Sequence, residues 1–210
     1  MFPLSFLYLK EFWNKYHQKQ IMSDKEIILE IVCRAFADNP RVNAVIRKGK
    51  KEKRIRIMAE YAHDLVGKLK GVYLSADKST VIFYYKQSEY KRGFWDNLKY
   101  IRMFLLCIKP SQLFKTMKRE KFIASLRPVP DYIYVWILGS VPGNKSLRGL
   151  ADIRDRLWAA SSESKLPILI ETTVEKVIKL YKYVGFEIYH HWYDESADIN
   201  LWFLMREYRE

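Results

Sequence analysis

The 210-residue chain has few cysteines, only Cys33 and Cys107, and no Cys-x-x-Cys pair. This scarcity excludes a disulfide-stabilised scaffold and gives no support to a zinc site or a redox pair. Both cysteines lie among apolar residues at helical spacing, so we expect buried, inert thiols in a reducing compartment. The sequence also lacks the roughly 18 uninterrupted apolar residues of a membrane-spanning helix. Its apolar start has neither a basic leader nor a small-residue cleavage pattern. These absences favour a cytoplasmic protein.

Acidic residues are in the minority, because 24 Asp and Glu stand against 37 Lys and Arg and give a formal net charge of +13. A basic surface suits polyanions, phosphorylated cofactors, acidic substrates or anionic membranes, and it is equally compatible with simple solvation. The sequence has neither an aromatic-interleaved RNA-binding signature nor a helix-turn-helix pattern, so we expect no nucleic-acid partner. His190 and His191 are adjacent on an expected strand and point to opposite faces, so we expect no metal site.

Hydrophobic residues form 49% of the chain and aromatic residues 15%, enough for one large core. Ser23 and Glu26 have the spacing of a helix capping box just before the first apolar helical residues. We therefore expect residues 22–210 to form a single domain and residues 1–21 to be an N-terminal appendage.

The coarse secondary structure alternates between helical and extended patterns. Apolar residues at helical spacing predict helices at 27–36, 55–69, 94–108, 111–125, 153–160 and 174–184. Apolar runs bounded by turn residues predict strands at 72–74, 80–85, 131–141, 167–170, 186–192 and 199–205. The run at 131–141 is apolar on both faces, which predicts a central strand covered on both sides. The order predicts an α/β or α+β domain with a mixed sheet and a helical insertion at about 90–127.

The helical insertion leaves two interpretations open. A regular apolar stripe runs along its first helix and comprises Phe94, Leu98, Ile101, Leu105 and Ile108. Such a stripe usually packs against the helix's own domain. Because Lys and Arg occupy the polar face, it could instead lie on a membrane surface.

Two segments carry more specific patterns. Residues 169–188 read L-I-E-T-T-V-E-K-V-I-K-L-Y-K-Y-V-G-F-E-I, a strand, a helix with Tyr181 near its end, and Gly185-Phe186 before the next strand. Residues 136–151 read W-I-L-G-S-V-P-G-N-K-S-L-R-G-L-A, a strand end, a loop and the start of a helix. Together the two segments resemble the motifs of the GNAT superfamily of acyl-CoA N-acyltransferases. The resemblance is good over 131–206 and fair over 24–86.

The resemblance implies a GNAT-like fold, in which a mixed, mostly antiparallel central sheet flanked by helices contains two splayed parallel strands. It implies acetyl-CoA or another acyl-CoA as cofactor, bound with its pantetheine in the gap between strands near 138 and 168. The implied reaction is direct transfer of the acetyl group to the primary amine of a small-molecule or peptide acceptor. A homodimer is compatible with this interpretation, and peripheral membrane contact is not excluded.

The resemblance also assigns candidate site residues. Those implied to bind the cofactor are Leu138, Gly139, Ser140, Gly143, Asn144, Lys145, Ser146, Leu147, Arg148 and Gly149. Amides of 138–140 would polarise the thioester carbonyl, and the helix N-terminus with Lys145 and Arg148 would hold the diphosphate. Tyr181 matches the family's general acid, which protonates the leaving thiolate. Its helical spacing suits a core aromatic equally well.

Glu171 is a candidate base for the substrate ammonium, directly or through water, and Asp131 is a second candidate. Glu171 could equally favour the start of the following helix. Gly185 follows that helix, where we expect a left-handed backbone conformation.

The loop at 142–151 departs from the family pattern of Gln or Arg, two residues, Gly, one residue, and Gly or Ala. Read from Pro142, Lys145 takes the basic position, but Arg148 and Leu150 replace the glycines. Shifting by one residue recovers Gly149 but puts Ser146 at the basic position. Side chains at glycine positions crowd a diphosphate. The alternatives are therefore a non-catalytic or degenerate CoA-binding module or, further off, a basic membrane- or nucleic-acid-associated protein.

Overall fold

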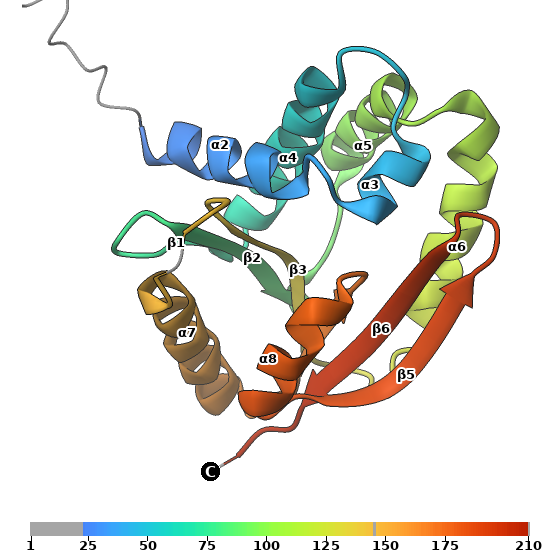
Figure 1. Ribbon diagram of the computed structural model, residues 1–210. Helices are drawn as coiled ribbons and strands as arrows, with labels where there is room; N and C mark the ends of the chain where they lie inside the picture. Colours follow the sequence, from blue (N-terminus) through green and yellow to red (C-terminus); the bar gives the residue numbers. More distant parts are fainter. Residues whose placement is uncertain (1–22, 145, 210) are drawn as a thin grey trace, which may run out of the picture.

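The structure is a computed structural model that describes residues 23–144 and 146–209. The appendage expected at residues 1–21 lies outside these ranges. The described helices are α2 (Asp24–Phe36), α3 (Pro40–Val45), α4 (Lys51–Gly67), α5 (Phe94–Cys107), α6 (Leu113–Ser125), α7 (Arg148–Ser164) and α8 (Ile178–Tyr183) (Figure 1). The strands are β1 (Val72–Leu74), β2 (Thr80–Lys86), β3 (Ile133–Ser140), β4 (Ile168–Thr172), β5 (Glu187–Asp194) and β6 (Ile199–Arg206). Short 3-10 turns occupy 87–89, 110–112 and 175–177.

The six strands form one sheet in the order β1-β2-β3-β4-β6-β5. All neighbouring pairs are antiparallel except β3 and β4, which are parallel and joined by the crossover helix α7. The expected fold class, a mixed and mostly antiparallel sheet flanked by helices, is confirmed. β3 lies inside the sheet and is covered on both faces, as its apolar sequence predicts.

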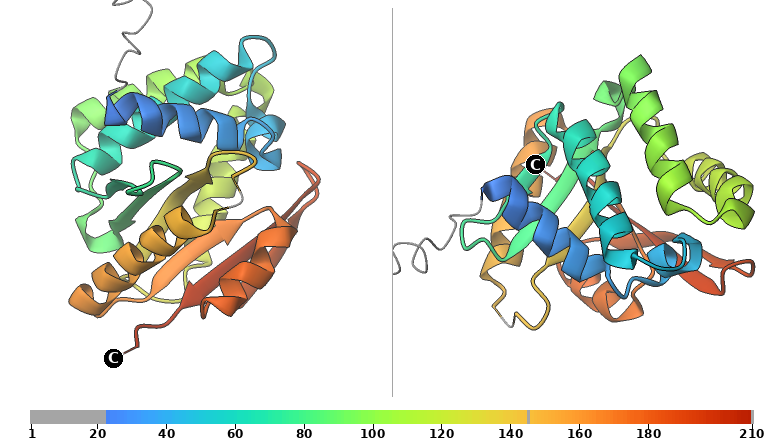
Figure 2. Two further views of the ribbon diagram at one scale, coloured as in Figure 1. Left: turned by 60° about the vertical axis from the view of Figure 1, so that its left-hand side comes forward. Right: turned by 90° about the horizontal axis from the view of Figure 1, so that it is seen from above.

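Helices cover both faces of the sheet (Figures 1 and 2). The side chains of β2 show which helices cover which face, because successive side chains of a strand point to opposite faces of the sheet. Val81 and Phe83 pack with α2 and α4, whereas Ile82 and Tyr84 pack with α7 and α8. The core is therefore two apolar layers with the sheet between them.

Local signals in the sequence place several helix ends. The Ser23 hydroxyl accepts a hydrogen bond from the Glu26 amide at 3.3 Å, which confirms the capping interaction that starts α2. Gly185 has φ of +90°, as expected after α8, and the Phe186 amide donates to the Tyr181 carbonyl at 2.9 Å. This pattern ends a helix through a left-handed residue, which costs glycine no steric strain.

The two cysteines differ in their surroundings. Cys107 is buried, and burial raises its pKa to about 11, so the thiol stays protonated at neutral pH. Cys33 is only partly buried, although burial also raises its pKa. The expectation of two buried thiols is therefore correct for Cys107 alone.

β3 contains a β-bulge at Trp136. Ile137 lies opposite Phe83 of β2, and Val135 lies opposite Tyr84, so Trp136 is an extra residue on β3. A bulge of this kind bends its strand and interrupts the regular ladder.

β3 and β4 separate at the same point. They pair over three residues only, Ile133–Val135 with Ile168–Ile170, although β3 continues to Ser140 and β4 to Thr172. The open half of β3, residues 136–140, keeps its pairing with β2. The splay that the family resemblance implies is thus present, and it begins where the bulge bends β3.

Four of the five members of the expected stripe on α5 do not pack against the domain, whereas the fifth, Ile108, is buried beside Val45 and Phe104. The exposed members are Phe94 (70%), Leu98 (43%), Ile101 (52%) and Leu105 (51%). α5 instead packs through a second apolar face that contains Met103, Phe104 and Cys107. The expectation that the stripe packs against its own domain is therefore wrong for its first four members and correct for Ile108, because α5 has two apolar faces and buries mainly the second one. Within the described residues, no helix is both long and apolar enough to cross a bilayer.

Candidate functional site

A cavity of about 640 Å³ lies where β3 and β4 separate. The open half of β3 and the end of β4 line it together with residues from α2, α3, α4, α5, α6 and α8. Its volume lies within the roughly 300–1,000 Å³ of sites that bind small molecules. The α5–α6 pair thus contributes one wall of this cavity.

Two backbone amides of the open half of β3 point toward the space that β4 leaves. The Val141 amide donates to the Ser79 carbonyl at 2.9 Å on the β2 side. Because N–H groups alternate along a strand, the Leu138 and Ser140 amides point away from β2, and the Gly139 amide points toward it. Gly139 has a packing role as well, since a Cβ there would lie 3.1 Å from the Ala35 Cβ of α2.

Tyr181 lies on α8 and contributes to the cavity wall. Its ring packs edge-on against Phe186 with centroids 5.7 Å apart, and it joins the core cluster beneath α7 and α8. Its hydroxyl makes no hydrogen bond to any described residue. Burial raises the pKa of Tyr181 above its ordinary value, so the hydroxyl retains its proton at neutral pH. Tyr181 is therefore both a core aromatic and a proton-bearing group on the cavity.

The Glu171 carboxylate lies in a buried ionic cluster and not in the open part of the cavity. Its side chain is 3% exposed and makes ion pairs with Arg127 at 2.5 Å and with Arg41 at 3.1 Å. The Tyr134 hydroxyl also donates to it at 3.1 Å. Arg127 in turn lies over the Tyr134 ring, 4.4 Å from its centroid. Three donors therefore compete for the two oxygens of this carboxylate.

The cluster extends to Glu120, which accepts from Arg41 at 2.6 Å. Burial alone would lower the pKa of Arg41, but Glu120 and Glu171 outweigh it and leave that pKa above its ordinary value. The pKa of Tyr134 is raised by burial and then by the Glu171 carboxylate. Among the described residues that line the cavity there are two carboxylates, Glu120 and Glu171, which are both paired with Arg41. The lining contains four arginines, Arg41, Arg92, Arg119 and Arg127, so its net charge is positive.

The rest of the cavity wall is largely aromatic. It includes Tyr61, Tyr85, Tyr90, Tyr100, Tyr132, Tyr134 and Trp136. Tyr85 and Tyr90 stack with centroids 4.3 Å apart. Thr116 and Thr173 also line the cavity, and across the described parts of the chain neither buried hydroxyl has a hydrogen-bond partner. Buried polar atoms normally have partners, so these two hydroxyls are suited to bind a ligand.

The described part of the loop after β3 lies outside the cavity lining. Gly143 has φ of +80°, and Lys145 is not among the described residues. The Asn144 side chain accepts from the Ser146 amide at 2.9 Å, and the Ser146 hydroxyl accepts from the Arg148 amide at 3.2 Å. The Ser146 and Arg148 amides near the start of α7 are therefore hydrogen-bonded to neutral side chains. Leu147 is the N-cap residue of α7, and its side chain is exposed.

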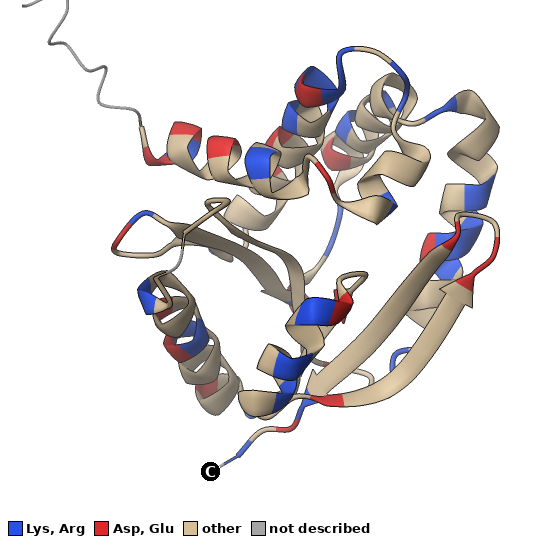
Figure 3. Ribbon diagram, viewed as in Figure 1, with Lys and Arg blue, Asp and Glu red and all other residues tan. Residues whose placement is uncertain are grey.

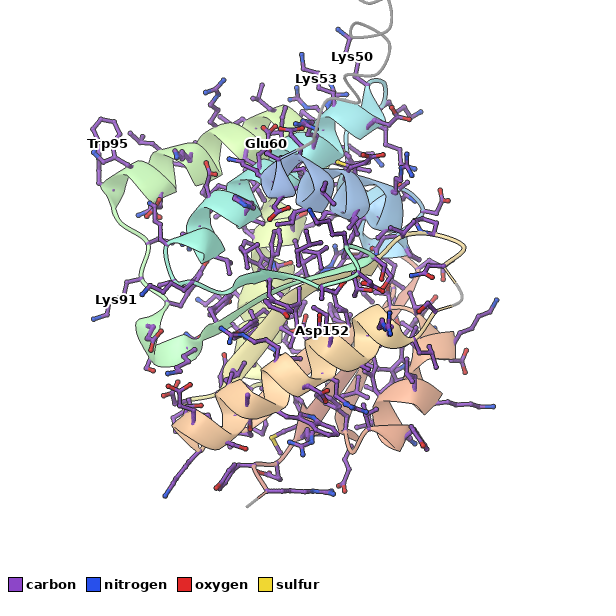
Figure 4. All side chains as sticks on the ribbon, turned by 90° about the vertical axis from the view of Figure 1, so that its left-hand side faces the viewer. Lys50, Lys53, Glu60, Lys91, Trp95 and Asp152 are labelled. Carbon is purple, nitrogen blue, oxygen red and sulfur yellow. The ribbon has the colours of Figure 1, made fainter. Side chains whose placement is uncertain are left out.

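Gly149 is required for packing of α7 against the turn between β1 and β2. A Cβ at this position would lie 2.3 Å from the Ser79 hydroxyl and 2.6 Å from that of Thr80. Asp152 fixes the same contact, since it accepts from the Ala76 amide at 2.7 Å and from the Tyr73 hydroxyl at 2.9 Å (Figure 4). Gly149, which matches a family glycine when the pattern is shifted by one residue, is thus explained by the contact between α7 and this turn.

The structure brings Leu138, Glu171 and Tyr181 to one cavity, but Gly139, Ser140 and the described loop candidates, 143–144 and 146–149, are not part of its lining. Sequence reasoning missed Arg41, which lies in the short helix α3, and Arg127, which follows α6, because a single Arg at such a position resembles an ordinary surface charge. Asp131 accepts from the Ser88 amide at 2.9 Å and does not line the cavity. In the described ranges, no three His, Cys, Asp or Glu side chains gather as a metal site requires.

No family model matches the sequence, and no curated protein matches it. Solved structures do match the fold. One is titled histone acetyltransferase HPA2 and related acetyltransferase, from Corynebacterium glutamicum, with TM-score 0.61, 12% identity, and 89% of this chain and 92% of that chain covered. Another is the C-terminal condensation domain of Ebony in complex with beta-alanyl-dopamine, with TM-score 0.62, 8% identity and coverage of 87% and 93%.

A third similar structure is arylalkylamine N-acetyltransferase 2 from Aedes aegypti, with TM-score 0.55, 14% identity and coverage of 90% and 97%. Identities this low show the fold alone. The chain has the fold of GNAT-superfamily acyl-CoA N-acyltransferases.

Proposed function

We propose that the protein transfers an acetyl group from acetyl-CoA to a primary amine. The observation that carries this proposal is the separation of β3 from β4 at the Trp136 bulge, which leaves the Leu138 amide and the Tyr181 hydroxyl on one cavity. The fold neighbours agree with acyl transfer as the general class of reaction.

The chain offers groups that fit the cofactor. Acetyl-CoA would supply an acetyl group activated as a thioester. The amides of Leu138 and Ser140 would donate to the carbonyl oxygen, where negative charge develops during attack. The start of α7 and Arg148 would hold the phosphates, together with Lys145. Charged oxygens accept more strongly than the Asn144 and Ser146 side chains that now occupy these amides, so they can displace them.

Tyr181 would supply the proton that the leaving thiolate needs. Its hydroxyl is protonated, belongs to the cavity wall, and has no acceptor among the described residues to hold it elsewhere. Glu171 fits a positioning role better than the role of base, because Arg41, Arg127 and Tyr134 already occupy its oxygens. We propose that it holds these three side chains in place on the acceptor side.

The lining of the cavity suggests the acceptor class. The wall is largely aromatic and its arginines outnumber its carboxylates, so an amine with an aromatic body fits better than a polyamine, whose several positive charges would be repelled. The molecule bound to the Ebony domain, beta-alanyl-dopamine, also has an aromatic body.

The proposal is tested by thiol release from acetyl-CoA over a panel of amines, with mass spectrometry of the products. The panel should contain 2-phenylethylamine, tryptamine, spermidine, lysine and a short peptide. We expect turnover with the aromatic amines first and loss of turnover in Tyr181→Phe. Turnover with spermidine or lysine alone would support acetyl transfer but contradict the proposal that the acceptor is an aromatic amine.

A non-catalytic CoA-binding module is the alternative, and the loop favours it, because Arg148 and Leu150 stand at glycine positions. Calorimetric titration with CoA distinguishes the two. Binding without turnover across the panel supports the alternative. No binding of CoA or acetyl-CoA contradicts both, and weaker binding in Lys145→Ala/Arg148→Ala would assign the phosphate site.

A further inference from the structure

Exposed apolar side chains concentrate on one part of the molecule. The described residues include fifteen large hydrophobic side chains that are exposed, and nine of them lie on α5 and α6. These nine are Phe94, Trp95, Leu98, Ile101, Leu105, Leu106, Phe114, Met117 and Phe122. Scattered exposed apolar residues are normal, but a concentration on two neighbouring helices marks an interaction surface.

The apolar residues of α5 form a continuous outer face. Phe94, Leu98, Ile101 and Leu105 follow the spacing i, i+4, i+7, i+11, and Trp95 and Leu106 lie beside them on the helix. Phe94 is 70% exposed and Trp95 73% exposed, so neither ring is used by the fold. Figure 4 shows Trp95 at the end of α5 pointing away from the body, with Lys91 projecting from the segment before it. The opposite face of α5 is the one that lines the cavity.

α6 continues this outer face. Phe114 is 78% exposed and Met117 is 56% exposed, while Thr116, Arg119 and Ile123 on the other side of the helix are buried. Figure 1 and the right-hand view of Figure 2 place α5 and α6 at the periphery of the molecule. We call the exposed side of residues 91–122 the outer face.

The outer face is strongly basic. Residues 91–122 contain nine Lys or Arg and two Asp or Glu, a net charge of +7 within a chain of +13. Both acids are engaged, Asp96 with Lys68 and Glu120 with Arg41. Lys115, Lys118 and Lys121 are exposed on α6, where blue segments recur in Figure 3. Of the nine cations, Arg119 is buried and paired with Asp194, and Lys99 is paired with Asp64. The exposed lysines of α6 lie beside the aromatic and aliphatic side chains of the outer face.

We propose that the outer face of α5 and α6 docks onto the surface of an anionic lipid bilayer. Amphipathic helices with Trp, Phe and Leu on one side and Lys and Arg beside them bind at the boundary of headgroups and acyl chains. Phe94, Trp95 and Phe114 enter that boundary, and the lysines of α6 contact anionic headgroups. A second copy of this chain fits poorly, because two such faces would bring like charges together.

Vesicle sedimentation with the full chain tests this docking. Vesicles of phosphatidylcholine alone are compared with vesicles that contain about one third phosphatidylserine, at about 0.1 M salt. We expect at least about tenfold stronger binding to the anionic vesicles and a marked loss at about 0.5 M salt. Bromine-labelled lipids should quench Trp fluorescence, and Trp95→Phe should remove that quenching while binding persists.

Paired variants identify the face. Phe94→Ser/Trp95→Ser should weaken binding severalfold, whereas Tyr183→Ser/Tyr193→Ser, two exposed aromatic residues outside α5 and α6, should leave it unchanged. Lys115→Glu/Lys118→Glu/Lys121→Glu should abolish the preference for anionic vesicles. The same charge reversal on α8 and the 3-10 turn before it, Lys176→Glu/Lys179→Glu/Lys182→Glu, should retain it.

Three results would overturn the proposal. The first is no binding to anionic vesicles. The second is vesicle binding that Phe94→Ser/Trp95→Ser leaves unchanged, which would assign it to another segment such as residues 1–22. The third is a dimer in sedimentation velocity that this variant dissociates, which would assign the face to a second copy.

Discussion

The two halves of β3 differ in the strands with which they pair. Residues 133–135 pair with β2 on one side and β4 on the other, and they bury apolar side chains almost completely. Residues 136–140 keep β2 but lose β4, and residues 136–138 line a cavity. One extra residue, Trp136, separates the closed half from the open half.

The comparison teaches how a sheet interior can provide a binding site. A central strand normally uses every amide in its ladders, which leaves none for a ligand. The bulge turns the Leu138 and Ser140 amides away from β2 just where β4 departs. The closed half then supplies stability and the open half supplies hydrogen-bond donors.

Ile168→Ala should give the largest effect, because Ile168 is fully buried in the closed half and pairs with Ile133. We expect the free energy of unfolding to fall by about 3–4 kcal/mol, measured by urea denaturation. Leu138→Ala in the partly buried open half serves as control, and we expect a loss of about 1 kcal/mol there. Equal losses in both halves would contradict the comparison.

Glu171→Gln tests the ionic cluster at the open half. Because the substitution leaves Arg127 and Arg41 without a buried carboxylate, we expect a loss of about 3 kcal/mol of stability in the same assay. Glu120→Gln is the matched control, since the Glu120 side chain is 49% exposed and its pair should contribute under about 1 kcal/mol. A loss as small in Glu171→Gln as in Glu120→Gln would show that the cluster does not support the open half.

Tyr181→Phe tests the chemistry that we assign to the open half. If Tyr181 protonates the leaving thiolate, kcat should fall by about 100-fold while the melting temperature stays within a few degrees. Tyr183→Phe, a tyrosine that is 88% exposed on the same helix, should leave kcat unchanged. Parent-like kcat in Tyr181→Phe would remove it as the general acid.

The smallest effect concerns Tyr61, whose ring lies edge-on to the bulge residue Trp136 with centroids 6.4 Å apart. Burial raises the pKa of Tyr61 to about 12, so the folded state holds this proton more tightly than the unfolded state. Its contribution is fully present below about pH 10 and is lost as pH rises toward 12. We expect the melting temperature to fall above pH 10, and Tyr61→Phe to lessen that fall by a few degrees. An identical fall in the variant would show that the Tyr61 hydroxyl is not responsible.

Much of the fold follows from local patterns in the sequence. The two-sided apolar run of β3 predicts a central strand, and the glycine after α8 predicts a left-handed helix end; both are confirmed. The bulge escapes such reasoning, because a strand that is apolar on both faces shows no break in alternation when one residue is added.

The site is harder to predict because its polar residues meet only in the folded chain. Arg41 and Glu171 are 130 residues apart in sequence, and neither position suggests a buried ion pair. The stripe on α5 failed for a different reason. A helix with two apolar faces does not reveal which face the domain will bury, and here Met103, Phe104 and Cys107 are buried in place of the stripe.

The α5–α6 pair has one further consequence, since each helix gives one side to the cavity and the other to solvent. An amine that fills the cavity and a lipid surface that holds the outer face would restrain the same two helices. Thermodynamic linkage then requires reciprocity: whatever factor the bilayer applies to amine affinity, the amine applies to bilayer affinity.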